Sequence, residues 1–206
     1  MPMRAAPVHR LRRMLLGVGV VALSSLPHVS AHAIDVYPTA KQIQTALDQG
    51  EEAAQKGMPP DSFYVRFGVT DEVNPKGFLI TKTSALAVLA THMALRGLQP
   101  SKADVTQVLE DKTMLISTVI FGNVRNFAVD SYMVLDQGGK TIKPVTVRFD
   151  AQADRSVVWP GSPRFKAKVV ASFNYADFDP KAQTTITVYP ATGGESHFSI
   201  NFGEIH

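Results

Sequence analysis

The stretch RFKAKVVASFNY at residues 164–175 constrains the fold most strongly, because apolar and polar side chains alternate along nearly all of it. A period of two is typical of a β-strand that buries one face. Such a strand needs neighbouring strands and a second layer to cover its apolar face. We therefore expect an inward face formed by Phe165, Ala167, Val169, Ala171, Phe173 and Tyr175.

The same period of two continues through much of the chain after residue 113. MLISTVIF at residues 114–121 is apolar on both faces, as in a central strand covered on each side. Gly138-Gly139 separates two alternating segments and predicts a hairpin. Short strands with frequent turn signals favour an immunoglobulin-like β-sandwich, although its Cys-Trp-Cys pattern is absent.

Residues 39 to about 112 have mainly helical spacing instead. Thr39 and Gln42 fit a capping box at the start of one helix, which we expect to end at Gly57. A short strand is predicted over residues 63–70. Ser101 predicts the cap of a further helix that ends near residue 110.

The start of the helix between these two elements is ambiguous. Asn74-Pro75 resembles a cap followed by proline at the first helical position. Ser84 is the alternative start, since Ile80 and its β-branched neighbours weaken the earlier one. The three-four apolar spacing favours the longer helix, ending at Gly97.

These patterns predict an α+β protein in which an N-terminal helical segment packs on a C-terminal antiparallel immunoglobulin-like β-sandwich. The expected divisions are a signal peptide at residues 1–33, a helical subdomain with a short strand at 34–112, and the sandwich at 113–206.

A secretory signal peptide is predicted by the arginines, apolar run and Ala-His-Ala site within residues 1–33. The mature chain would begin at Ile34, or after Ala31. Arg12-Arg13 leaves open twin-arginine export instead of general secretion. The apolar run is too short to span a membrane. We expect a periplasmic or secreted protein without a transmembrane segment in its mature chain.

The charge and cysteine content exclude several kinds of site. The chain has 21 Lys+Arg against 18 Asp+Glu, and four of the arginines lie in the predicted leader. The remainder is nearly neutral and gives no global argument for nucleic-acid binding. Because the chain has no cysteine, disulfides, thiolate metal sites and cysteine nucleophiles are excluded.

The segment NYADFDP at residues 174–180 has two readings. Asp177 and Asp179 could contribute oxygens to a calcium ion, but no glycine or closing glutamate completes an EF-hand loop. Aspartate and asparagine also form turns with their own backbone. We favour a corner between strands in which Phe178 plugs the edge of the sandwich. We expect neither a metal nor a cofactor.

Catalysis has few candidate residues. His92 is the main possible base, in a helix where we expect a hydrogen-bonded core histidine, whereas His197 should face solvent. The histidines lack metal-ligand spacing, and the chain has no G-x-S-x-G elbow. A hydrolase with a cleft between helices and sandwich, using His92, remains the alternative.

The predicted binding residues lie around the start of the 164–175 strand. Arg164, Lys166 and Lys168 form an outward basic stripe, and Trp159 lies in the proline-rich loop before it. Lysines on a strand often serve only to keep it solvated. A tryptophan beside cations is also typical of recognition surfaces.

The function that this sequence favours is a non-catalytic binding or adaptor module outside the cytoplasm, with an unidentified envelope protein or ligand as partner. The expectation rests on the architecture and on the lack of catalytic motifs, which is a fold-level analogy. The alternatives are the hydrolase and a calcium-stabilised structural module.

Overall fold

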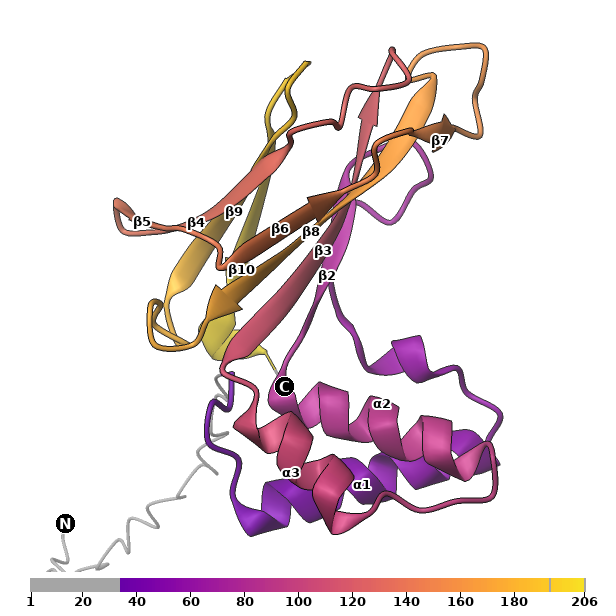
Figure 1. Cartoon of the computed structure of the whole chain (residues 1–206), viewed down its shortest axis with the longest axis vertical. Helices are drawn as coiled ribbons and strands as arrows, with labels where there is room; N and C mark the ends of the chain where they lie inside the picture. Colours follow the sequence, from indigo (N-terminus) through magenta and orange to yellow (C-terminus); the bar gives the residue numbers. More distant parts are fainter. Residues whose placement is uncertain (1–33, 193, 206) are drawn as a thin grey trace, which may run out of the picture. The chain divides into compact units, whose positions relative to one another are not determined.

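The computed structural model of the chain describes residues 34–192 and 194–205. The predicted signal peptide at residues 1–33 lies outside the described residues. Within them the structure contains three α-helices and two sheets of antiparallel strands (Figure 1). The predicted mixed α+β class is therefore confirmed.

The larger sheet has the strand order β1-β2-β3-β8-β6, and β7 also pairs with β8. All of these pairs are antiparallel. Its strands are β1 (Val65–Gly68), β2 (Lys76–Ile80), β3 (Thr113–Gly122), β6 (Thr146–Phe149), β7 (Asp154–Arg155) and β8 (Phe165–Asn174).

The smaller sheet has the order β10-β9-β4-β5 and is also antiparallel. Its strands are β4 (Tyr132–Gln137), β5 (Lys140–Ile142), β9 (Gln183–Tyr189) and β10 (Ser196–Asn201). Gly138 and Gly139 both have positive φ between β4 and β5, so the predicted hairpin is confirmed.

One hydrophobic core joins the two sheets, which Figure 1 shows as separate layers. On β8 the buried residues are Ala167, Val169, Ala171 and Phe173, as the alternation predicts. Met133, Leu135, Ile186 and Val188 enter the same core from the smaller sheet. β3 lies between β2 and β8, so its predicted central position is also confirmed.

The helices begin at capping boxes. Thr39 and Gln42 cap α1 (Ala40–Gln55), and Ser101 with Asp104 caps α3 (Lys102–Glu110). In each box the side chain of the cap accepts the backbone N–H of the third helical residue. The side chain of that residue accepts the backbone N–H of the cap in turn, so two otherwise free donors are satisfied. Both predicted helix starts are confirmed.

The favoured start of the second helix is wrong. Residues 76–80 form strand β2, and α2 (Lys82–Ala94) begins after it, with Thr81 as the cap. β2 pairs with β1 on one side and β3 on the other, so ladder hydrogen bonds hold this segment extended. The β-branched residues around Ile80 suit that strand, and tertiary pairing outweighs the helical spacing.

The helices form a second, smaller core of their own. Leu86 and Ala87 of α2 pack with Ala46 of α1, and partly buried residues of α3 and of the short 3₁₀ helix η1 (Pro60–Phe63) contact them. Within the described residues, none of the helices is both long and apolar enough to cross a membrane.

The two predicted subdomains share one sheet. Strands β1 and β2 lie on the helical side of the predicted boundary at residues 112–113, yet β2 pairs with β3 along five residues. The separation of the chain at this boundary stays a prediction.

Candidate functional site

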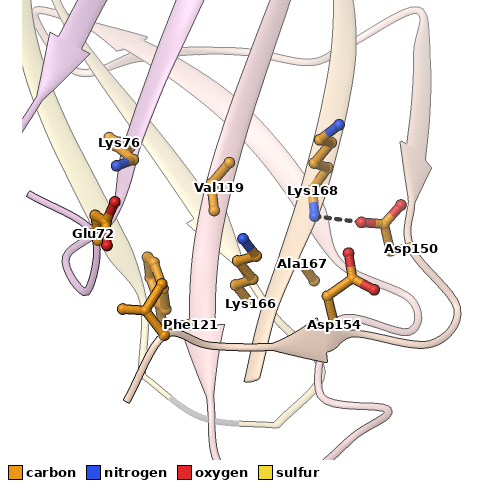
Figure 2. A pocket seen from close by; sticks show the side chains of 10 residues that line it. Glu72, Lys76, Val119, Phe121, Asp150, Asp154, Lys166, Ala167 and Lys168 are labelled. Atoms are coloured by element: carbon orange, nitrogen blue, oxygen red, sulfur yellow. Dashed lines mark hydrogen bonds between the residues drawn. The ribbon is translucent and has the colours of Figure 1, made fainter. Parts of the chain in front are cut away.

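A pocket of approximately 320 Å³ lies on the outer face of the larger sheet (Figure 2). Val119 and Phe121 of β3 line it together with Lys166 and Lys168 of β8. The remaining lining residues are Lys76 of β2, Glu72 before it, Asp150, Asp154, Val157 and Ala167. We call it the lysine pocket.

Strand register brings these side chains together. Lys76 is paired with Val119, and Val119 with Lys168, so three neighbouring strands contribute one row. Phe121, Lys166 and Asp154 form the second row across β3, β8 and β7. Directly paired residues have Cβ atoms about 4.5–5.5 Å apart on one face. The first row places Val119 between two lysines, and the second places Lys166 between Phe121 and Asp154.

The carboxylates lie on both sides of the lysines. Figure 2 shows Asp150 and Asp154 beside β8, and Glu72 on the opposite side with Lys76. The Lys168 backbone N–H donates to Asp150 Oδ2 at 2.8 Å, and Asp150 N–H donates to the Lys168 carbonyl at 3.1 Å. These two bonds fix the segment after β6 against β8.

The ammonium groups of Lys166 and Lys168 have no ionic partner within the residues that the structure describes. The ion pairs found there are Lys56–Glu52, Arg66–Asp61 and His197–Glu195. Lys76 differs, because its Nζ donates to the backbone carbonyl of Asp71. The two lysines of β8 are therefore free to bind an external anionic group.

The other side of the pocket is held by a turn at Asp71. Its carboxylate accepts the side-chain amide of Asn74 and the backbone N–H groups of Val73 and Asn74, the latter two at 2.9 and 2.7 Å. These hydrogen bonds, with the Asn74 side chain first, lower the pKa of Asp71 below its ordinary value. The turn positions Glu72 and Lys76.

The structure separates the four predicted binding residues into two places. Lys166 and Lys168 line the pocket, whereas Arg164 and Trp159 do not. Arg164 is exposed, and Trp159 is 44% exposed in the loop between β7 and β8. The Arg155 guanidinium stacks over the Trp159 ring, 4.1 Å from its centroid.

The NYADFDP segment forms the predicted corner. Asn174 Oδ1 accepts the Ala176 N–H at 3.1 Å, and Asp179 Oδ1 accepts the Lys181 N–H at 2.8 Å, so both side chains make turns. Phe178 is buried against Tyr175 and Phe202. Asp177 is exposed beside it. The plug is confirmed, and the calcium hypothesis is not tested by these bonds.

His92 lies on the exposed side of α2, so its predicted core position is wrong. The buried face of α2 is formed instead by Leu86, Ala87, Ala90 and Thr91. A catalytic role of His92 remains untested, and the described pockets do not include it among their lining residues.

His197 is exposed, as predicted, and it joins two further polar groups. Its Nδ1 lies 3.1 Å from Thr187 Oγ1, and its Nε2 lies 3.2 Å from Glu195 Oε2. Thr187 is paired with His197 across β9 and β10. Such a pair of directly opposite polar side chains, here the exposed His197 and the buried Thr187, is typical of cross-strand stabilisation.

Sequence reasoning missed Lys76, Glu72, Asp150 and Asp154 as neighbours of the basic stripe. They come from two stretches of the chain outside β8, residues 72–76 and 150–154. The pairing of β2 with β3, of β3 with β8 and of β7 with β8 would have been needed to connect them to the lysines. The alternation of β8 could supply only the lysines.

The arrangement is suited to binding. Charged groups of both signs surround apolar side chains in an open hollow. Within residues 34–192 and 194–205, no group of three or more His, Asp or Glu side chains lies in a position to hold a metal ion.

The sequence matches no protein-family model, and no significant match was found among curated proteins.

Proposed function

We propose that the protein is an exported, non-catalytic binding module that captures a charged segment of an envelope partner in the lysine pocket. Two antiparallel sheets with a shared core support an immunoglobulin-like sandwich as its body. The predicted leader supports a periplasmic or secreted location.

The observation that carries this proposal is that Lys166 and Lys168 line the pocket without an ionic partner in the described part of the chain. Both side chains line the pocket, and neither is engaged in an ion pair within the described residues. Lysine is a point charge with three donors, so each side chain can bind a carboxylate or phosphate oxygen. The pairing of β8 with its neighbouring strands fixes the Cα positions of both lysines.

The three carboxylates make the pocket selective for more than negative charge. Asp154, Asp150 and Glu72 would repel a ligand that is uniformly anionic. A ligand is complementary to both the lysines and the carboxylates if it places an anionic group at the lysines and a cationic or hydrogen-bond-donating group at the carboxylates. Val119 and Phe121 add an apolar surface between them. A mixed-charge peptide segment with an apolar residue has this chemistry.

The experiment is capture from the cell envelope of the source organism. The immobilised, processed protein is compared with Lys166→Glu/Lys168→Glu, and bound proteins are quantified after cross-linking. We expect the double variant to lose at least about ten-fold of the recovered partner, because a desolvated like-charge contact costs several kcal/mol.

The matched control is Lys143→Glu/Lys181→Glu, which reverses the charge of two exposed lysines outside the pocket. It should capture the partner as well as the wild type. Equal melting temperatures of both variants exclude misfolding as the cause. Undiminished capture by Lys166→Glu/Lys168→Glu would rule out the pocket as the binding site.

A further inference from the structure

The loop between β7 and β8 exposes three consecutive large apolar side chains. Val157, Val158 and Trp159 are 57%, 41% and 44% exposed. The loop extends past the ends of the two strands that it connects (Figure 1). Exposed aliphatic residues occur singly on most proteins, but a run of three at a loop tip is unusual for a surface in contact only with water.

Hydrogen bonds hold this loop in place. Ser156 N–H donates to the Arg164 carbonyl at 2.8 Å and closes its base, and Gly161 N–H donates to the Val158 carbonyl at 2.7 Å within it. The Ser156 hydroxyl also donates to the Pro163 carbonyl. Because the loop is already ordered, little conformational entropy is lost when a surface binds it.

The neighbouring loop after β3 adds to the same surface. Asn123 Oδ1 accepts the Arg164 N–H at 3.2 Å, and Ala153 N–H donates to the Arg125 carbonyl at 2.8 Å. Val124, between these two residues, is 50% exposed. A further exposed apolar side chain therefore lies in the loop that is hydrogen-bonded to Arg164 at the base of the tip.

Positive charge flanks the tip. Residues 155–168 include Arg155, Arg164, Lys166 and Lys168 and no acidic residue. Arg155 and Arg164 are exposed at the two ends of the loop. The nearest acidic residues along the chain, Asp150 and Asp154, lie at the lysine pocket rather than in the loop.

We propose that this tip, residues 156–163, docks on the surface of an anionic lipid bilayer. Val158 and Trp159 enter the headgroup region, and Arg155 and Arg164 contact lipid phosphates. Tryptophan favours that depth because its ring is apolar and its N–H is polar. Arginine and lysine near the surface are attracted by anionic lipids.

A bilayer fits this surface better than a protein partner does. A stable protein interface buries about 800 Å² on each side, which a narrow tip of a few side chains does not supply. Interfacial binding needs only a shallow apolar insertion of about 5–10 Å together with cationic contacts. Val157 also lines the lysine pocket, but the residues placed at the bilayer, Val158, Trp159, Arg155 and Arg164, do not, so the two proposals can be tested separately.

The single tryptophan of the chain makes the test specific. Processed protein is titrated with phosphatidylcholine vesicles, with and without phosphatidylglycerol, while Trp159 fluorescence is recorded. We expect a blue shift with the anionic vesicles, quenching by lipids brominated in their acyl chains, and co-sedimentation that weakens as salt increases. Soluble glycerophosphoglycerol, which has the headgroup without the bilayer, should cause no shift.

Variants separate the two kinds of contact. Val158→Ser should weaken the fluorescence-detected binding about three-fold or more, since burial of one valine side chain is lost. Arg155→Gln/Arg164→Gln should weaken co-sedimentation with anionic vesicles by about five-fold per arginine. The control Val145→Ser removes an apolar side chain that is 59% exposed just before β6 and should bind normally.

Three results would overturn the inference. They are an unchanged Trp159 spectrum with anionic vesicles, an equal shift with the soluble headgroup, or wild-type co-sedimentation by Trp159→Ala. Failure of partner capture by Lys166→Glu/Lys168→Glu, with normal vesicle binding, would instead concern the lysine pocket alone.

Discussion

Lys82 is a buried cation at the first turn of α2, where the helix dipole disfavours positive charge. Its Nζ donates to the Leu109 carbonyl in the last turn of α3, where the dipole favours a cation. Its Nζ also lies 5.5 Å from the centroid of the Tyr175 ring, and Tyr175 directly follows β8. This one side chain links two helices to the larger sheet.

Lys82→Met should lower the free energy of unfolding by about 1.5–3 kcal/mol, because the Leu109 carbonyl loses a charged donor. The free energy of unfolding is measured by urea denaturation. Lys102→Met, at an exposed position of α3, should change stability by less than about 0.5 kcal/mol. Equal losses from the two substitutions would show that Lys82 does not link these elements.

Tyr175 gives a prediction for alkaline pH. Burial, and secondly the charge of Asp111, raise the pKa of its hydroxyl well above the usual value. Because the pKa is higher in the folded than in the unfolded protein, the protonated hydroxyl contributes its full stability at pH values below the unfolded pKa of about 10. This contribution is lost as the pH rises above that value.

Tyr175→Phe should therefore reduce the alkaline loss of stability, measured as the melting temperature across that pH range. The exposed Tyr189 provides the matched control, Tyr189→Phe, which should leave the pH profile unchanged. In the wild type, tyrosinate absorbance of Tyr175 should develop only together with unfolding. If the melting temperature of Tyr175→Phe falls with alkaline pH as steeply as that of the wild type, this account is contradicted.

At the residue scale, the sequence could predict which side chains of β8 face outward, because the strand alternates. It could not predict the environment of Lys82 or His92. A helix that is apolar nearly all round does not indicate which of its few polar residues is buried. Their burial depends on where α1 and α3 pack.

At the scale of elements, α1 and α2 approach closely at Gly50. A Cβ atom there would lie 2.2 Å from the Ala87 carbonyl oxygen and 2.7 Å from Ala90 Cβ. The Thr91 hydroxyl donates to the Gly50 carbonyl at 3.0 Å across the same contact. Glycine therefore serves helix packing here, in spite of its low helix propensity.

Gly50→Ala distinguishes propensity from packing. Propensity alone predicts a gain of about 1 kcal/mol, whereas overpacking predicts a loss of about 1–3 kcal/mol. We expect the loss, measured by urea unfolding. Gly194→Ala, where the added Cβ meets no atom within 4 Å, should be nearly neutral. A stabilised Gly50→Ala protein would mean that the helices are not in this close contact.

The Asp71 turn between β1 and β2 gives a prediction for acidic pH. Because the pKa of the Asp71 carboxyl is lowered in the folded protein, the hydrogen bonds of the turn are complete above the ordinary pKa of 3.8. They are lost as the pH falls through the lowered pKa of the folded state. The amide NMR shifts of Val73 and Asn74 should titrate with a midpoint below 3.8. A midpoint at or above that value would refute the hydrogen bonding described for the turn.

The helix starts at Thr39 and Ser101 were predictable from the sequence, although a capping box alone is not decisive, since Thr81 and Ser84 form one at the start of α2 as well. The start of α2 was not, because residues 76–80 have a spacing compatible with a helix and a composition compatible with a strand. Their pairing partners decide the outcome, and one of them, β3, lies more than thirty residues further along the chain.

At the scale of the whole molecule, the pocket depends on a strand order that the sequence does not reveal. β2 and β8 lie on opposite sides of β3, so Lys76 and Lys168 face one hollow although they are far apart in the chain. Period two predicts the faces of each strand but not its neighbours. The α+β class was therefore predictable, and the site was predictable only in its β8 half.

The lysine pocket is the central element of the proposed function, and hydrogen exchange of the complex tests it most directly. The processed protein is labelled alone and with the partner recovered by capture. The account predicts slowed exchange in three segments of the pocket, which are residues 72–76, residues 119–121, and residues 150–157 with their neighbours 166–168. Protection confined to the helices or to the smaller sheet, with these three segments unchanged, would contradict it.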